Sequence, residues 1–126
     1  MTYIIKSSGG GTLLHMVAHK GYIKLLNTLL TIQGIRLNEK DDYGRTPFHS
    51  AVMSGKIDVV KVLQNTKGTG LNDQDDKGRT ALHWAAIDGD IEIVKALVDI
   101  RGIRVNEQDH NGLTPLDWAK NRAIQK

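Results

Sequence analysis

Three histidines recur at one fixed spacing, and histidine is the side chain best suited to metal binding and to proton transfer near neutral pH. His15, His49 and His83 are separated by 34 residues each. Ligands of one ion must converge on one point, whereas a strict period places equivalent residues in a row along stacked units. We therefore expect these histidines to have a structural role. His19 and His110 lie outside this spacing, have no carboxylate that the sequence places beside them, and are expected at the surface.

The carboxylates follow the same spacing. Asp41, Asp75 and Asp109 each begin a turn, where an aspartate accepts hydrogen bonds from backbone N–H groups. A glycosidase-like pair needs two carboxylates that face one cleft, and equivalent residues along a ridge do not provide it. The chain has no cysteine, so thiol nucleophiles and disulfides are excluded, and the glycines at 9–11 lack the Gly-Lys-Ser/Thr of a phosphate loop. We expect no enzyme activity, no cofactor and no metal site.

The composition is that of one folded domain. The chain has 126 residues, 40% of them hydrophobic and 25% charged. The net charge of +3 is small, and only 5% of the residues are aromatic. The chain therefore has neither the strong positive charge that attracts phosphates nor the aromatic residues that stack on bases, and nucleic acid is not an expected partner. No apolar run approaches the roughly 20 residues that a membrane helix needs, and no signal peptide is visible. We expect a soluble monomer without a membrane partner, in the cytoplasm or nucleus.

The spacing of the histidines is part of a repeat that runs through the whole sequence. Glycines and threonines recur every 34 residues, at Gly10, Gly44, Gly78 and Gly112 and at Thr12, Thr46, Thr80 and Thr114. Within a unit, Thr46-Pro47 predicts a helix start, and Gly55 predicts its end. Apolar residues from Ile57 onward fall on one helical stripe, and Gly68 stands where this second helix is expected to stop. A polar segment that ends on glycine then predicts an extended arm and a tight turn.

Two segments carry the resemblance to a known family. They are Gly44-Arg45-Thr46-Pro47-Phe48-His49-Ser50-Ala51 and Gly78-Arg79-Thr80-Ala81-Leu82-His83-Trp84-Ala85-Ala86. Both are similar to the Gly-x-Thr-Pro-Leu-His-x-Ala-Ala signature of the ankyrin repeat family. The resemblance implies an all-α solenoid with short β-hairpin-like tips, in which each histidine forms hydrogen bonds at the start of its helix. It also leaves a second location open, because proteins of this family include secreted effectors that act in a host cytosol.

The resemblance also fixes the expected domain organisation. An N-terminal arm or cap at residues 1–9 precedes three full repeats at 10–43, 44–77 and 78–111, and residues 112–126 form a partial fourth repeat. The whole chain, 1–126, is one ankyrin repeat domain in this interpretation, and the absent second helix of the fourth repeat leaves open whether it is a fragment of a longer chain. The usual period of the family is about 33 residues, so each unit here has one extra residue between the apolar helix and its glycine.

A binding surface is expected where equivalent positions differ between repeats, because stacking requires similar residues at the buried positions. The resemblance implies that partners dock on the tips and on the concave surface of the inner helices. The residues that vary at these places are Asp42, Tyr43, Arg45, Met53, Ser54, Asp76, Lys77, Arg79, Ile87, Asp88, His110, Asn111 and Leu113. We expect a non-catalytic module that binds another protein through them. The alternative is a structural spacer within a larger multidomain protein.

Two tryptophans and three alanine substitutions complete the expectations. Trp84 and Trp118 share one phase of the repeat; packing between repeats is favoured for them, and a contact with the partner stays open. Substitution of His83 or Gly78 by alanine is expected to destabilise the array by about 1 to 3 kcal/mol. Substitution of Arg79 by alanine is expected to have no such effect, since Arg79 is assigned to the binding surface.

Overall fold

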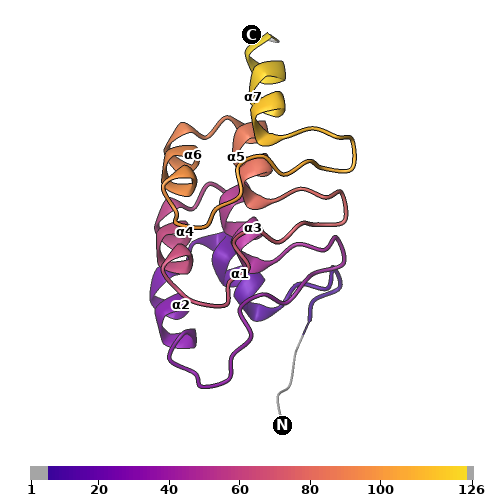
Figure 1. Cartoon of the computed structure of the whole chain (residues 1–126). Helices are drawn as coiled ribbons and strands as arrows, with labels where there is room; N and C mark the ends of the chain where they lie inside the picture. The colour runs from indigo at the N-terminus through magenta and orange to yellow at the C-terminus, as the bar shows by residue number, and fades with distance from the viewer. Residues whose placement is uncertain (1–5, 125–126) are drawn as a thin grey trace.

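Seven helices form the part of the chain that the computed structural model describes, residues 6–124. They alternate between two columns, which we call inner and outer (Figure 1). The inner helices are α1 (Leu13–Lys20), α3 (Pro47–Met53), α5 (Ala81–Asp88) and α7 (Pro115–Ile124), and the outer helices are α2 (Ile23–Leu29), α4 (Ile57–Gln64) and α6 (Ile91–Val98). No helix in this part of the chain is long and apolar enough to cross a membrane.

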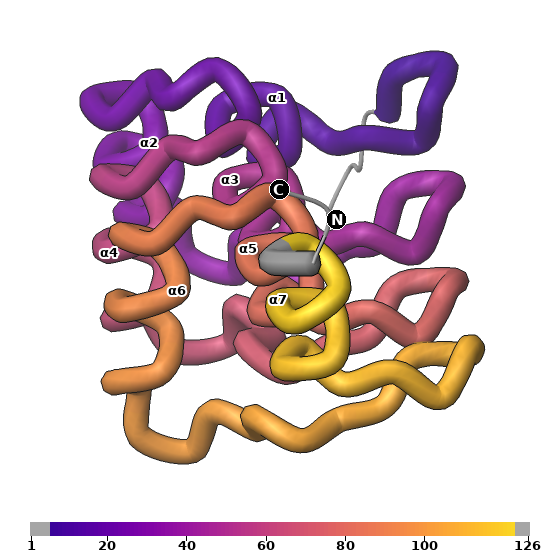
Figure 2. Tube along the Cα trace, turned by 90° about the horizontal axis from the view of Figure 1, so that it is seen from above, coloured from indigo at the N-terminus to yellow at the C-terminus, as the bar shows by residue number. Residues whose placement is uncertain are grey.

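The elements form three parallel layers. α1, α3 and α5 each pack against the next inner helix and against the outer helix that follows them. The loops that join an outer helix to the next inner helix project away from the helices and form the tips, on the side opposite the outer helices (Figure 2). The prediction of a helical repeat solenoid is therefore confirmed, with the core between the two helical columns. Its largest fully buried apolar side chains include Phe48, Leu26, Leu63, Ile93 and Leu97.

The inner helices begin as the sequence predicts. Thr12, Thr46 and Thr80 are the N-caps, and the side chain of each accepts a hydrogen bond from a histidine N–H three residues later. The histidine ring in turn accepts from the backbone N–H of the threonine, so the two residues satisfy each other's free donors. Pro47 occupies the first turn of α3, where its missing N–H costs nothing.

The outer helices end earlier than predicted. α2, α4 and α6 stop at Leu29, Gln64 and Val98, and the glycines expected to end them lie several residues further on. An irregular loop fills the interval, with hydrogen bonds such as the one from Thr66 N–H to the Leu63 carbonyl. The glycines have positive φ angles of 82° to 86° inside this loop. The extra residue of the 34-residue repeat therefore lengthens the exit loop and not the helix.

The tips are hairpin-like turns without regular strands in the described residues. In each tip an aspartate N–H donates to the carbonyl four residues later, as from Asp41 to Arg45, Asp75 to Arg79 and Asp109 to Leu113. A similar turn precedes α1, where Lys6 pairs with Thr12 and closes residues 7–11. The expected N-terminal arm lies in part outside the described residues, since the description begins at Lys6.

Candidate functional site

The histidine column joins each repeat to the next. The Nε2 atoms of His15, His49 and His83 lie 2.7, 3.0 and 2.9 Å from the carbonyl oxygens of residues 45, 79 and 113. Each ring therefore accepts at Nδ1 from its own repeat and donates at Nε2 to the following one, which defines the neutral tautomer. Burial lowers the pKa of His49 although the Arg79 carbonyl opposes the shift, so this ring stays neutral at pH 7. The predicted structural role is confirmed, and the bond to the next repeat is new.

The aspartate column holds the tips closed. Oδ1 of Asp41 accepts the N–H groups of Tyr43 and Arg45, both at 2.9 Å, and Asp75 and Asp109 repeat this pattern. Burial alone would raise the pKa of Asp109. The bonds from two backbone N–H groups, from the Trp118 indole and from Arg79 outweigh burial and lower the pKa of this carboxyl. These aspartates have the structural role that the sequence predicts.

Tryptophan and arginine side chains alternate where the tips meet the inner helices. The Arg45 guanidinium lies 5.0 Å from the Tyr43 ring centre and 5.3 Å from that of Trp84. The Arg79 guanidinium lies 5.1 Å from Trp84 and 4.9 Å from Trp118. We call the row Tyr43, Arg45, Trp84, Arg79 and Trp118 the cation–π ladder. Each such stack contributes about 0.5 to 2 kcal/mol, more where it is shielded from water.

The two tryptophans also bind their own tips. The indole N–H of Trp84 donates to Oδ2 of Asp75, and that of Trp118 to Oδ2 of Asp109, both at 2.8 Å. Both rings are half-buried. Packing between repeats, the favoured interpretation, is therefore observed for both, through their stacks with Arg45 and Arg79. Their shared phase in the repeat was the available signal, but the sequence analysis did not assign them to the site.

Arg79 is not a free surface residue. Its side chain is only 11% exposed, and its Nε lies 3.4 Å from Oδ2 of Asp109, whose side chain is fully buried. The ion pair joins Arg79 to the next tip, and its stack on Trp118 links the third repeat to the fourth. These contacts argue against the expectation that its replacement by alanine leaves stability unchanged, and we now predict a loss.

Adjacent tips are also hydrogen-bonded to each other through their backbones. The N–H of Asp76 donates to the Tyr43 carbonyl at 3.0 Å, and that of His110 to the Lys77 carbonyl at 2.9 Å. The tip glycines make this approach possible: a Cβ on Gly78 would lie 2.9 Å from the His110 nitrogen. The tips therefore form one continuous edge and not separate loops.

The predicted site residues fall into two groups along this edge. Six are exposed at the tips, namely Asp42, Tyr43, Asp76, Lys77, His110 and Asn111. The others lie at the base of the tips or at the ends of the inner helices, half-buried at Arg45, Met53, Ser54, Arg79, Ile87 and Leu113 and exposed at Asp88. All of them belong to the tips or to the ends of the inner helices, and Figure 2 shows the tips and inner helices on the side of the stack away from the outer helices.

Several residues at the inner helix ends already have partners inside the chain. The hydroxyl of Ser54 is hydrogen-bonded to Nδ1 of His19, and the Ile87 carbonyl accepts from Arg122 at 3.0 Å. Partial burial raises the pKa of Asp88, although Arg122 opposes the shift. His19 and Arg122 connect successive repeats in this way, which their spacing in the sequence does not indicate. His19 and His110 are exposed, as expected.

The site has no converging set of acid, base or metal ligand. Within residues 6–124, no group of three or more His, Asp and Glu side chains is placed to hold a metal ion. The carboxylates and imidazoles of the repeat face backbone groups and tryptophan, as described above. The chemistry that the surface offers is that of hydrogen bonding, aromatic contact and charge.

Comparison with known proteins gives the family. No curated protein matches the chain significantly. A family model described as ankyrin repeats, in three copies, matches residues 4–75 and 62–125. The match covers nearly the whole sequence and agrees with the stacked helix pairs, the projecting tips and the histidine column. The chain belongs to the ankyrin repeat family.

Proposed function

We propose that this chain binds a partner protein through one surface, made of the exposed tips and the adjoining ends of the inner helices. Ankyrin repeats are generally protein–protein interaction modules without catalytic activity. The proposal is narrower, because it assigns the contact to the tip edge around Tyr43, Arg45 and Lys77 and extends it to Met53 and Ile87 on the inner helices.

The proposal rests on a difference between two arginines at equivalent positions of the repeat, one with a partner in the described chain and one without. Arg79 is ion-paired with Asp109, whereas the Nε of Arg45 is buried and has no hydrogen-bond partner in the described residues. Arg45 is nevertheless held in place between Tyr43 and Trp84. The buried Nε cannot reach a partner, but the terminal N–H groups of this fixed guanidinium can bind a carboxylate with little loss of conformational entropy.

The surroundings of Arg45 support a protein partner. Tyr43 is 60% exposed, although large aromatic side chains are usually buried. Tyrosine and arginine are enriched in the residues that dominate binding energy at protein interfaces. Lys77 adds a cation at the next tip, whereas Asp42 and Asp76 add carboxylates, so the partner must offer charges of both signs.

Affinity capture from a cell lysate with identification by mass spectrometry tests the proposal. The intact chain is compared with a variant that combines Tyr43→Ala, Arg45→Ala and Lys77→Ala and that is shown to fold by circular dichroism. The control variant, Lys24→Ala with Lys61→Ala and Lys95→Ala, removes three exposed cations from the outer helices.

We expect proteins that are retained by the intact chain and by the outer-helix control but lost by the tip variant. Identical protein lists for all three chains would contradict the proposed surface and favour the alternative of a structural spacer. Proteins that the outer-helix control loses and the tip variant retains would place the interface on the outer helices instead.

A further inference from the structure

The last outer helix exposes apolar residues whose equivalents are covered in the repeat before it. Ile91, Val94 and Val98 are spaced three and four residues apart on α6, so they form one stripe along the helix. Ile91 is 70% exposed and Val98 is exposed as well. At the equivalent positions of α4, Ile57 packs against the core and Val60 has no exposed surface. α6 packs on α4, and in the described chain no outer helix packs on α6 in the same way.

The last inner helix exposes a matching apolar face. Leu116 is 59% exposed and Ala119 is exposed as well, whereas Leu82 and Ala85 are buried at the same positions of α5. Leu116 lies two residues before Trp118, and therefore on the opposite side of α7. The Trp118 indole is bonded to the tip, so Leu116 faces the side on which the outer helices lie (Figure 2). α1, α3 and α5 are each covered by an outer helix on this side.

The two apolar faces border one position in the stack. Figure 1 shows the inner column continuing from α5 into α7, whereas no described helix stands above α6. A helix placed there would contact α6 as α6 contacts α4, and α7 as α6 contacts α5. We call this position the open outer slot, and the residues that border it are Ile91, Val94, Val98, Leu116 and Ala119.

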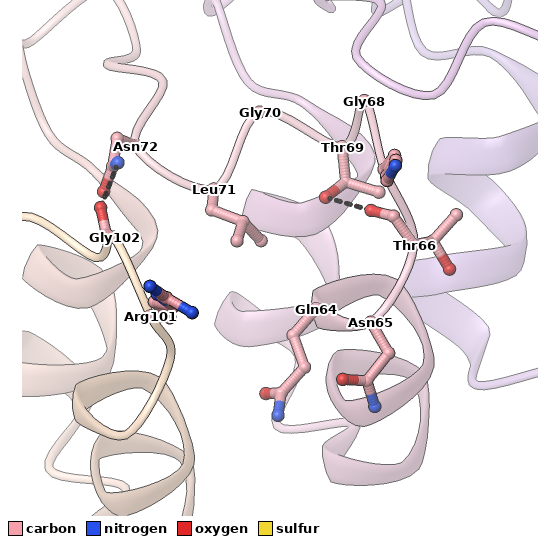
Figure 3. Close-up of a pocket in the computed structure, with 11 residues that line it drawn as sticks. Gln64, Asn65, Thr66, Gly68, Thr69, Gly70, Leu71, Asn72, Arg101 and Gly102 are labelled. Carbon is pink, nitrogen blue, oxygen red and sulfur yellow. Dashed lines mark hydrogen bonds between the residues drawn. The ribbon is translucent and has the colours of Figure 1, made fainter.

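The exit loops show the same difference between the second and third repeats. Figure 3 shows the junction of these repeats, where the Asn72 side chain donates to the Gly102 carbonyl at 2.9 Å. Asn72 also accepts from the Arg104 N–H at 2.8 Å, so the exit loops of α4 and α6 are tied together. Asn106 stands at the equivalent position after α6 and is exposed, and the described chain has no exit loop beyond it. The outer side of the third repeat therefore lacks both a covering helix and this loop contact.

The end of α7 that faces away from the stack limits what can fill the slot. Asp117 takes the position of His83, whose ring reaches the following repeat, and instead accepts from the N–H of Thr114 at 3.0 Å. Lys120 is exposed at the position where Ala86 is buried. A further inner helix would have to cover these two charged side chains, which costs free energy. The outer column can therefore accept one more helix, whereas the inner column already has a polar end.

A second copy of the chain does not fit this shape. Its N-terminal end exposes Leu25 on α2, at the position where Val59 and Ile93 are buried, so α2 is the helix that it could stack on α6. However, α1 packs beside α2 in the same copy and would have to lie where α7 already stands. The occupant must therefore present a helix that has no companion in the inner column.

The earlier outer helices show which residues such a helix needs. α4 buries Val59, Val60 and Leu63, and α6 buries Ile93 and Leu97, which are the first and last of the same three positions. The spacing i, i+1 and i+4 places these residues on adjoining sides of the helix, against the outer helix before it and the inner helix beside it. The outward side of both helices carries exposed charged residues.

We propose that the open outer slot binds an amphipathic α-helix of a partner protein with apolar residues at this spacing. The bound helix covers the stripe on α6 and the apolar face of α7, and it extends the outer column by one helix. The contact continues an interface that the chain already forms twice, between α2 and α4 and between α4 and α6. It does not depend on the function proposed for the tips, and either assignment can fail alone.

A peptide with the sequence of residues 89–103 serves as the probe, because α6 itself fills the equivalent place one repeat earlier. A lactam between Lys95 and Asp99, which are four residues apart and both exposed, keeps the free peptide helical. The peptide is added to the ¹⁵N-labelled chain, and the backbone amide signals are followed by NMR. The control peptide has the same composition and the same lactam, but its apolar residues are spread around the helix.

Three variants of the chain locate the binding site. Ile91→Ser with Val98→Ser removes two residues of the stripe on α6, and Leu25→Ser with Ile32→Ser removes two aliphatic residues at the other end of the stack. All four residues are exposed, so both variants should fold, which circular dichroism checks. Leu116→Ser, at another exposed position, keeps the proposal testable if the α6 variant folds poorly.

We expect the outer-helix peptide to shift the amide signals of α6 and of residues 115–119, with saturation. The Ile91/Val98 and Leu116 variants should bind it about tenfold more weakly, because they remove apolar area that the peptide covers. The Leu25/Ile32 variant should bind it as the intact chain does. Absence of saturable shifts, equal shifts with the control peptide, or unchanged affinity of the Ile91/Val98 variant would overturn the proposal.

Sedimentation of the chain without peptide, over a range of concentrations, tests the other occupant. We expect a monomer at every concentration. Self-association that is lost in the Ile91/Val98 variant would mean that a second copy covers the slot, and the assignment to a partner helix would then be wrong.

Discussion

The Nε atom of Arg79 lies 3.4 Å from Oδ2 of Asp109, and the side chain of that aspartate has no exposed surface. The contact links residues 30 positions apart, the same separation as that of the histidine bonds to the next unit. Arg79 is thereby part of the array that holds the repeats together, although its charge and its place beside the tips suggested a partner contact.

Replacement of Arg79 by alanine should therefore destabilise the chain. It removes two cation–π stacks and leaves Asp109 without its cation, for an expected loss of about 2 kcal/mol in the free energy of unfolding. Arg45→Ala, which has two similar stacks but no ion pair, should cost about 1 kcal/mol. Urea denaturation of the two variants measures the difference, and a larger loss for Arg45→Ala would contradict the assignment.

The buried histidines should be more important for stability than the exposed one. His83→Ala leaves the Thr80 N–H and the Leu113 carbonyl without their partners and opens a cavity, so we expect a loss of about 2 to 3 kcal/mol. His19→Ala, at an exposed position, should change the stability by no more than about 0.5 kcal/mol. Thermal and urea unfolding of both variants give the comparison. Equal losses would show that the buried ring hydrogen bonds stabilise the stack no more than the exposed bond from His19 to Ser54 does.

The tip glycines offer a matched pair. Gly78 and Gly112 have φ angles of +76° and +77°, so alanine is strained at both. Only at Gly78 would the new Cβ lie 2.9 Å from a backbone nitrogen of the next tip, since nothing lies within 4 Å of it at Gly112. We expect Gly112→Ala to cost about 1 kcal/mol and Gly78→Ala about 2 to 3 kcal/mol. Similar losses in urea denaturation would mean that neighbouring tips do not approach this closely in solution.

The stability of the fold should decrease when the pH falls below 6.5, the ordinary pKa of histidine, because His49 is buried in its neutral form. Burial lowers the pKa of His49 below its ordinary value of 6.5, so the unfolded chain binds this proton more readily than the folded one. The contribution of the neutral ring is therefore complete above pH 6.5 and is lost as the pH falls from there towards the lower pKa of the folded state.

NMR titration of the His49 ring in the folded chain and in the chain unfolded by urea measures this shift directly. We expect the folded ring to titrate at the lower pH and the melting temperature to decrease over the same interval. Asp109 acts in a separate window, because its lowered pKa stabilises the fold above its ordinary value of 3.8 and the contribution is lost below it. A folded His49 that titrates at or above the unfolded value would contradict the burial of this ring.

The structural features that recur with the 34-residue period could be predicted from the sequence. Thr46, His49 and Gly55 each have a local structural reason for their place in the unit, so the start and end of an inner helix follow from the residues alone. The aspartate of each tip was predictable for the same reason. These contacts span only a few residues, and each appears several times in the chain.

Contacts that join different repeats could not be predicted in the same way. The stacking of Arg79 between Trp84 and Trp118 depends on side-chain rotamers and on the spacing of two repeats, and neither is encoded in a local pattern. The same limit applies to the ends of the outer helices, where Gly68 was a plausible stop but the chain leaves the helix at Gln64. The exit loop there carries its own hydrogen bonds, which compete with the last helical turn.

The most direct test of the proposed function is to find which backbone segments a bound partner protects from hydrogen exchange. Hydrogen–deuterium exchange, measured with and without a protein recovered by affinity capture, reports this for every backbone segment. We expect slower exchange on binding at residues 42–45 and 76–79 and at the ends of α3 and α5, with no change in α2, α4 and α6. Protection confined to the outer helices, with unchanged exchange at the tips, would contradict the assignment of the binding surface.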